Sequence, residues 1–235
     1  MEILTATIAW LTTAARWQGP DGIPTRMLEH LEIAIPSVLA AALVALPVGA
    51  WIGHTGRYAA VAINVANLGR AIPSYAVLAI ILPISLRFSP DLGLSVIPTF
   101  TAMWLLAIPP ILIGTFAGIR AVDRDLVEAA RGLGLTEVQI LSEVELPLAL
   151  PVVAGGLRTA AVQVIATATL GAVVAYGGLG RYIIDGIARN EDDRLMAGVV
   201  LVAGMAITAE LAFALLQRAL VPRGLRRVAV HAEPT

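Results

Sequence analysis

Long apolar runs, separated by short polar or glycine- and proline-rich breaks, make up most of this chain. A helix needs about 20 predominantly apolar residues to cross the hydrocarbon core of a bilayer. Five runs meet this requirement, and the breaks between them contain residues that end helices. The pattern therefore predicts an all-α membrane protein with five membrane-spanning helices, at about 31–53, 58–86, 94–119, 148–176 and 195–220.

The second run contains its own interruption, Arg70 followed by Pro73. Proline lacks an amide hydrogen and clashes with the preceding helical turn, so we predict a kink in this span. Other prolines lie inside or at the start of spans and are candidate hinges, with an ordinary helix irregularity as the alternative for each. These are Pro98, Pro109, Pro110, Pro147 and Pro151.

The first thirty residues form a separate segment. Its apolar run is broken by Arg16 and is too short to span a bilayer. Trp10 and Trp17 favour a helix that lies at the membrane–water interface, because aromatic rings prefer the headgroup level. We therefore predict an interfacial segment over residues 1–30, whose helix is broken by the turn sequence 19–22.

The charged stretch at 120–147 interrupts the apolar pattern and carries the signals of two short helices. Asp125 with Glu128, and Thr136 with Gln139, have the capping-box spacing, in which each side chain bonds a backbone amide that the helix leaves free. The stretch holds six acids against three arginines, and this sign of charge is unfavourable for binding nucleic acid.

The first of these two helices has an apolar face and a glycine stop. Gly132 and Gly134 supply the left-handed turn that ends it. Pro147 fits a kink or the first turn of the next helix, since it has no amide hydrogen to donate. The apolar face consists of Leu126, Ala129, Ala130 and Leu133.

Composition supports the membrane assignment and limits the chemistry. The chain is 58% hydrophobic and 14% charged, with a mean hydropathy of +0.83, values that a soluble domain of this length does not show. It contains no cysteine, which excludes disulfides and zinc–thiolate sites. All sixteen basic residues are arginine, so the chain has no P-loop lysine and any ATPase must be another polypeptide. We expect no metal site and no cofactor.

Arginines show which ends of the spans are expected to be cytoplasmic. Arg57 follows the first span, three arginines lie in the charged stretch, and others crowd the tail at 222–235. Cytoplasmic segments carry an excess of basic residues. We therefore predict that the charged stretch and the basic tail are cytoplasmic and that the N-terminus is outside.

Three ionisable residues, Arg70, Arg158 and Glu210, lie inside predicted spans. Each is costly in hydrocarbon unless it is paired or hydrated, so we hypothesise that Glu210 pairs with Arg158 or Arg70. The alternatives are a proton-relay role for Glu210 and an Arg158 side chain that extends to the interface.

Polar residues in the fourth span are candidates for lining a pathway. Gln163, Thr167 and Thr169 recur at near-helical spacing, and Tyr176 follows them. Hydrogen bonding between helices is the alternative for the three polar residues, and packing is the alternative for the tyrosine. His54 is interpreted as a polar residue at a helix end.

The spacing within the charged stretch resembles the EAA coupling loop of bacterial ABC-importer permeases. That resemblance implies a cytoplasmic helix pair that docks into a groove on the ATP-hydrolysing subunit. Small side chains at 129 and 130 would allow close approach, and the glutamate at 128 either contacts the partner or only caps its helix. The matching residues are Glu128, Ala129, Ala130, Gly134, Val144, Leu146 and Pro147, with Val144 where the family usually has Ile.

Further segments resemble the osmoprotectant branch of these permeases, which carries glycine betaine, carnitine, choline or proline. They are 52–56, 70–74, 167–170 and 177–183, although methionine-type permeases share a comparable glycine segment. Ala175 and Tyr176 stand where this branch often has Gly-Ala.

The resemblance implies a type I ABC importer permease fold in the bacterial inner membrane. It also implies two ATPase subunits, a second permease chain that is identical or related, and an extracytoplasmic binding protein. The chain itself would be no enzyme. The alternatives are an importer of another small solute, such as methionine, and an independent proton-coupled transporter that works through Glu210.

Overall fold

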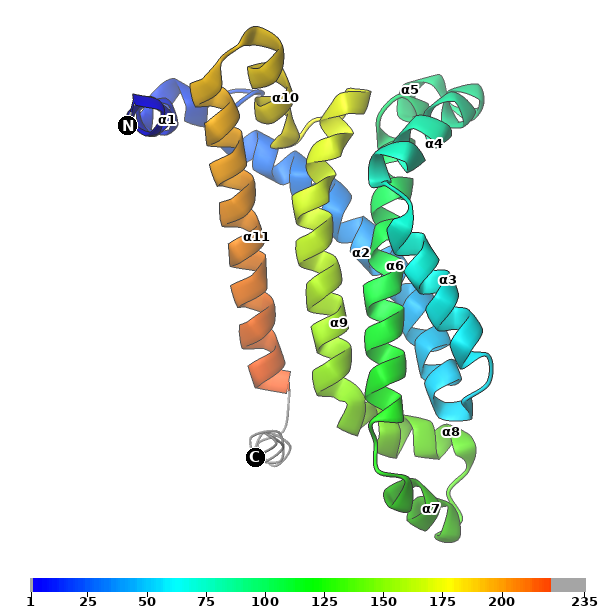
Figure 1. The fold of residues 1–235 in the computed structure, drawn as a ribbon. Coiled ribbons are helices and arrows are strands. Elements are labelled where there is room, and N and C mark those ends of the chain that lie inside the picture. The colour runs from blue at the N-terminus through cyan, green and yellow to red at the C-terminus, as the bar shows by residue number, and fades with distance from the viewer. Residues whose placement is uncertain (1, 221–235) are drawn as a thin grey trace.

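The computed structural model describes residues 2–220, apart from the side chains of Arg70 and Leu220. The regular elements in this range are helices, and the long ones run side by side as a bundle (Figure 1). In chain order they are α1 (Glu2–Thr12), η1 (Ala14–Trp17), α2 (Ile23–Thr55), α3 (Ala59–Ala71), α4 (Ser74–Phe88), α5 (Pro90–Gly93), α6 (Val96–Arg120), α7 (Arg124–Gly132), α8 (Glu137–Gln139), the π-helical η2 (Ile140–Glu145), α9 (Leu146–Thr167), the 3-10 segment η3 (Ala168–Val174), α10 (Gly180–Arg189) and α11 (Asp192–Leu220).

The number of spans agrees with the prediction once the second is recognised as broken. Within residues 2–220, four helical segments are long and apolar enough to cross a membrane, and the pair α3 and α4 makes a fifth if it is counted as one bent span. The two helices meet at 84°, at the break that contains Pro73. The all-α membrane fold is confirmed. The predicted basic tail at 222–235 lies outside the described residues.

Helix α6 lies at the centre of the bundle, between α2 and α9, while α11 packs on α9 and α10. The helices α6 and α9 approach closely through two glycines. A Cβ atom on Gly114 would lie 2.8 Å from the Cα of Gly156, and one on Gly156 would lie 2.7 Å from the carbonyl oxygen of Pro110. Small residues at such contacts permit the tight packing that holds helices together in lipid, where no hydrophobic effect does so.

Most of the candidate hinge prolines do not interrupt a helix. Pro109 and Pro110 lie inside a continuous α6, and Pro151 lies inside α9. The backbone groups that these prolines leave unpaired can be satisfied by neighbouring groups in a packed bundle. Among the prolines proposed as hinges, Pro73 is the one that coincides with a sharp bend.

Helix α2 begins at Ile23, well before the predicted start of the first span. This part is charged, and its charges are paired in the fold. Arg26 forms ion pairs with Asp21 and Glu29. His30 is fully buried, and its Nε2 lies 2.8 Å from the carbonyl oxygen of Ile165 near the end of α9.

Helix α10 and Trp10 pack together. Residues 180–189, between the fourth and fifth predicted spans, form the amphipathic helix α10. Trp10 is only 6% exposed and packs edge-on against Tyr182 of α10, with ring centroids 5.2 Å apart. The ring is therefore a packing residue between α1 and α10 rather than an interfacial anchor.

Candidate functional site

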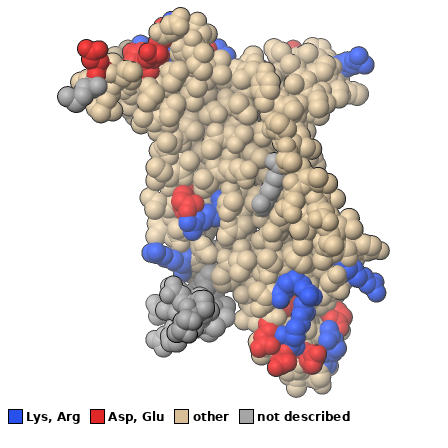
Figure 2. All heavy atoms as spheres, in the orientation of Figure 1, with Lys and Arg blue, Asp and Glu red and all other residues tan. Residues whose placement is uncertain are grey.

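The charged stretch forms a hairpin between the end of α6 and the beginning of α9; we call residues 120–147 the coupling hairpin. It lies at the end of the bundle where α2 and α11 also end, opposite the N-terminus (Figure 1). Figure 2 shows acidic and basic atoms gathered over the hairpin, next to a largely uncharged belt. A charged hairpin beyond an apolar bundle is placed to contact a partner outside the membrane.

The caps of the hairpin helices are partly as predicted. Thr136 and Gln139 form the expected capping box, which is confirmed. The N-cap of α7 is Asp123 and not Asp125: the Asp123 carboxylate accepts the backbone N–H of Asp125 at 3.0 Å. The predicted Asp125–Glu128 box is wrong because the helix starts two residues earlier, so Glu128 lies exposed within α7.

The turn of the hairpin depends on one glycine and not two. Gly134 has φ +87°, the left-handed conformation that glycine adopts most readily, whereas Gly132 is the last residue of α7. The second helix of the hairpin is not separate, because α8 continues through the π-helical η2 into α9. Pro147 lies in the first turn of α9.

The apolar face predicted for α7 is split by the fold. Ala130 is buried in a small core with Val127 and Ile140, but Leu126 and Leu133 are 51% and 82% exposed. The face that packs inward is therefore rotated from the predicted one. The two outward leucines and Val138 of α8, which is 76% exposed, are large apolar side chains that the hairpin leaves uncovered. Surfaces of this kind mark contact sites for other proteins.

The family-pattern residues fall into two sets. Glu128, Ala129, Gly134 and Pro147 are exposed. Val144 and Leu146 are partly buried and pack against the core of the hairpin, which also contains Ala130. The pattern thus combines residues that build the hairpin with residues that it presents outward.

A cluster of charges that the sequence analysis missed joins the hairpin to the end of α2. Glu145 is completely buried, and its Oε2 lies 2.5 Å from Nδ1 of His54. The other imidazole nitrogen, Nε2, lies 3.1 Å from a carboxylate oxygen of Glu137. Glu137 also receives two hydrogen bonds from Arg131, at 2.7 and 2.9 Å. Arg124 lies 3.7 Å from the remaining oxygen of Glu145.

These contacts show that not all six acids of the hairpin are free. Glu145 is unavailable to a partner, and Glu137 is engaged by Arg131, whose pKa the carboxylate raises. A signal for Glu145 was present in the sequence: Leu141 and Ala149, four residues before and after it, place the carboxylate on an apolar helical stripe. A charge there predicts a buried partner, but the sequence does not say that the partner is His54.

Within the bundle, the structure brings Glu210 of α11 against Arg158 of α9 in an ion pair, with side chains 37% and 35% exposed. A second contact between these helices lies nearby in sequence, where Gln217 donates to the carbonyl oxygen of Pro151 at 2.8 Å. The side chain of Arg70, the other predicted partner, lies outside the described part of the structure.

The other candidate pathway residues do not gather into one site. Gln163 and Thr167 are half-buried on α9, and the Thr169 hydroxyl of η3 donates to the carbonyl oxygen of Ala166 at the end of α9, at 3.1 Å. The Tyr176 hydroxyl donates to the carbonyl oxygen of Glu29 on α2, at 3.1 Å.

The glycine segment that follows Tyr176 is fitted against the same part of α2. The backbone N–H of Gly178 donates to the Glu29 carboxylate at 2.7 Å. A Cβ atom on Gly177 would lie 2.2 Å from that carboxylate, so the double glycine makes room for it.

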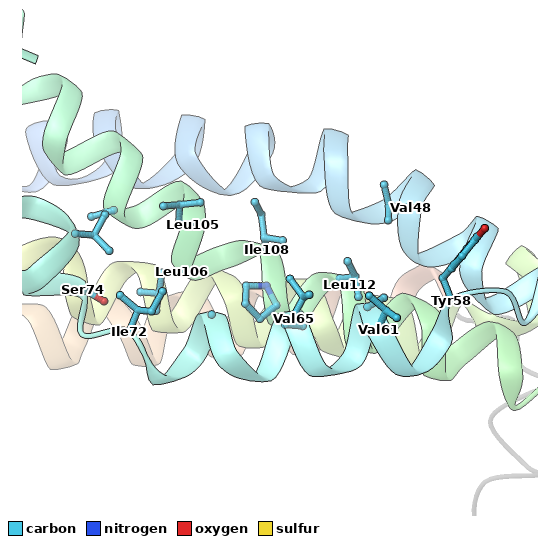
Figure 3. Close-up of a pocket in the computed structure, with 16 residues that line it drawn as sticks. Val48, Tyr58, Val61, Val65, Ile72, Ser74, Leu105, Leu106, Ile108 and Leu112 are labelled. Carbon is cyan, nitrogen blue, oxygen red and sulfur yellow. The ribbon is translucent and has the colours of Figure 1, made fainter. Parts of the chain in front are cut away.

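An apolar cavity of about 460 Å³ lies between α3, α6 and α2 (Figure 3). Val61 and Val65 line one side and Leu105 and Leu112 the other, and the polar side chains among the lining residues are Tyr58 and Ser74. Arg158, Glu210 and the pathway candidates do not line it. Its lining suits hydrocarbon rather than a charged solute.

The arrangement defines a fold, that of the permease subunits of ABC importers. A chain of the MetNI methionine ABC transporter, solved in an inward-facing conformation, superposes with a TM-score of 0.73 at 22% identity, over 85% of this chain and 96% of that one. A chain of an amino acid ABC transporter crystallised with histidines superposes with a TM-score of 0.63 at 21% identity, over 91% of this chain and 96% of that one. These likenesses establish the type I ABC importer permease fold.

Sequence comparison then places the chain in a family. Residues 31–226 match the family described as the binding-protein-dependent transport system inner membrane component, and the chain belongs to it. It is 35% identical to the carnitine transport permease protein OpuCB of Listeria monocytogenes, over 84% of this chain and 88% of that protein. It is 34% identical to the choline transport system permease protein OpuBB of Bacillus subtilis (85% and 89%) and 33% identical to the osmoprotectant import permease protein OsmW of Salmonella typhimurium (84% and 91%). The protein is therefore a multi-pass inner-membrane permease.

Proposed function

We propose that this chain is the pathway-forming subunit of an ABC importer for a compatible solute of the glycine betaine, carnitine or choline type. The observation that carries the proposal is the match to osmoprotectant permeases over more than four fifths of both chains. The methionine transporter shares the fold at lower identity and does not favour methionine as the solute.

The coupling hairpin is the proposed docking element for the ATPase. Its tip presents Leu126, Leu133 and Val138, all more than half exposed, beside the exposed Glu128 and Ala129. Exposed leucines on a charged surface favour a groove in another protein, in which the apolar side chains are buried and the carboxylates meet basic groups. This end of the bundle then faces the cytoplasm and the N-terminus faces outside.

The assembly follows from the same reasoning. Two ATPase subunits would engage two hairpins, one on each of two permease chains, and an extracytoplasmic binding protein would deliver the solute. Closure of the ATPases would displace the hairpins, and each hairpin continues without a break from α8 through η2 into α9. A push on the hairpin would therefore move α9, which carries the pathway candidates Gln163 and Thr167 together with Arg158.

The ion pair in the bundle argues against the rival reading, a proton-driven transporter. A relay carboxylate must exchange protons freely, but Glu210 is held by Arg158. Transport should therefore depend on ATP and on the partner ATPase. Uptake of glycine betaine into proteoliposomes that contain the permease, its neighbouring ATPase and binding protein measures this directly, and an uncoupler should leave it unchanged when ATP is supplied.

The substitution Leu133→Asp tests the docking surface. It places a charge at a position that is 82% exposed, so the permease should fold normally but lose co-purification with the ATPase and ATP-driven uptake. Burying an unpaired carboxylate in an interface costs several kcal/mol, which corresponds to a loss of binding of about a hundredfold or more. Leu92→Asp in α5, at the opposite end of the bundle, is the control and should retain binding (Figure 1). Equal ATPase binding by both variants would contradict the assigned docking surface.

A further inference from the structure

The buried carboxylate of Glu145 is a charge in the coupling hairpin that docking does not use. It has no exposed surface, and its Oε1 has no hydrogen-bond partner within residues 2–220. Its shortest polar contact is with His54 Nδ1, at 2.5 Å, and this contact joins η2 to the last turn of α2, 91 residues earlier in the chain. An isolated buried carboxylate is costly, so the chain retains this one only with a partner nearby.

The two sides of the His54 ring have different surroundings. Nδ1 faces the buried Glu145, whereas Nε2 faces Glu137, whose side chain is 55% exposed and already paired with Arg131. Exposed ion pairs contribute little to stability, while loss of His54 leaves the buried Glu145 carboxylate with Arg124 alone, 3.7 Å from its other oxygen. The Nδ1 contact is therefore the one that fixes the hairpin to α2.

Helix α2 links this contact to the other end of the molecule. It is one helix of 33 residues, about 50 Å long at 1.5 Å per residue. At the far end, its Glu29 carboxylate accepts the N–H of Gly178 in the glycine segment. Near His54, α2 is tightly packed on α6, because a Cβ atom on Gly53 would lie 2.7 Å from the Cβ of Ile119.

We propose that His54 is a positioning residue that fastens the coupling hairpin to α2 through Glu145. Displacement of the hairpin then moves α2 together with α9 and reaches the glycine segment at the opposite end. This inference rests on the proposed function, since it needs an ATPase that moves the hairpin. It assigns α2, rather than α9 alone, to the transmission of that movement.

Three substitutions at one position separate the two ring contacts. An asparagine amide nitrogen falls near the place of Nδ1, and a glutamine amide nitrogen falls near the place of Nε2. His54→Asn therefore keeps a donor for Glu145, His54→Gln keeps one for Glu137, and His54→Ala keeps neither.

The measurement is the ratio of glycine betaine transported to ATP hydrolysed, in proteoliposomes that contain the permease, ATPase and binding protein. Co-purification with the ATPase is followed in parallel. A charged hydrogen bond is worth about tenfold in an equilibrium. We expect the ratio to fall by about that factor in His54→Gln and His54→Ala, while ATP hydrolysis and ATPase binding persist. His54→Asn should stay within about twofold of the unchanged protein, because the Glu145 contact is restored.

The outcomes are distinguishable from failure of the proposed function. If the unchanged protein shows no ATP-dependent uptake, the proposed function itself is wrong. If the unchanged protein transports and His54→Ala transports with the same ratio, this inference alone is overturned. It is also overturned if the asparagine and glutamine variants behave alike, or if all three variants fail to assemble, since His54 would then have only a structural role.

Discussion

The ion pair between Arg158 and Glu210 joins α9 to α11 within the apolar part of the bundle. Removing one partner leaves a charge unpaired in a medium that solvates it poorly, whereas removing both leaves none. Both side chains are about one third exposed, so the loss should be smaller than for a fully buried pair.

We therefore expect Glu210→Gln and Arg158→Gln each to lower the stability of the detergent-purified protein by about 1–2 kcal/mol. The double variant should lose less than the sum of the two single losses, because the pair is removed as a unit. Thermal unfolding measures this, with Arg87→Gln, an exposed arginine, as the matched change of charge elsewhere. Additive losses would show that the two residues do not interact.

At the scale of single residues, the sequence predicted local interactions better than distant ones. The Thr136–Gln139 capping box was predictable because both partners lie within one turn. The partner of Glu145 was not, since His54 lies far away in sequence and reaches it only through the packing of α2. For Glu210 the sequence left two candidate arginines, and only the fold places Arg158 beside it.

Among the helices, the contact of α6 with α9 depends on the absence of side chains. Gly155 and Gly156 are neighbours in α9, but a Cβ atom on Gly155 would meet nothing within 4 Å, whereas one on Gly156 would lie 2.7 Å from a backbone oxygen of α6. This adjacent pair offers a test in which the chemical change is identical and only the packing differs.

Gly156→Ala should destabilise the protein by about 1–3 kcal/mol, because the added methyl group forces the helices apart. Gly155→Ala should be neutral or stabilising by up to about 1 kcal/mol, because alanine is the better helix former. Thermal unfolding in detergent compares the two. Equal effects would show that α6 and α9 are not in close contact at Gly114 and Gly156.

Whole elements were predictable where their hydrophobic pattern was long and uncharged. The spans at α6 and α11 have nearly the predicted bounds. The start of α2 was not predictable, because the charges in its first turns are paired only in the fold. The short amphipathic helix α10 was not predictable either, because the partners of its apolar stripe, α1 and α11, meet it only through the fold.

At the scale of the whole molecule, the two ends of the bundle are expected to face opposite compartments. The chain contains no cysteine, so a single introduced one can report its side of the membrane. Gly132 lies on the coupling hairpin with open space around it, and Gln18 lies exposed in the N-terminal segment.

A membrane-impermeant maleimide added to intact spheroplasts should label Gln18→Cys and not Gly132→Cys. Labelling of both should occur after the membrane is permeabilised. Labelling depends on whether the reagent reaches the cysteine and not on the charge of the loop that carries it. The experiment therefore tests the orientation independently of the distribution of arginines. Labelling of Gly132→Cys in intact spheroplasts would place the hairpin outside and would contradict the docking proposal.

The contact between His30 and Ile165 lies two residues before α9 gives way to η3. Carbonyl groups at a helix end need a donor that lipid does not provide. His30 Nε2 of α2, 2.8 Å away, supplies one to the Ile165 carbonyl oxygen. The end of the fourth crossing is therefore held by the first, and we expect a change in bilayer thickness to act on these two helices together.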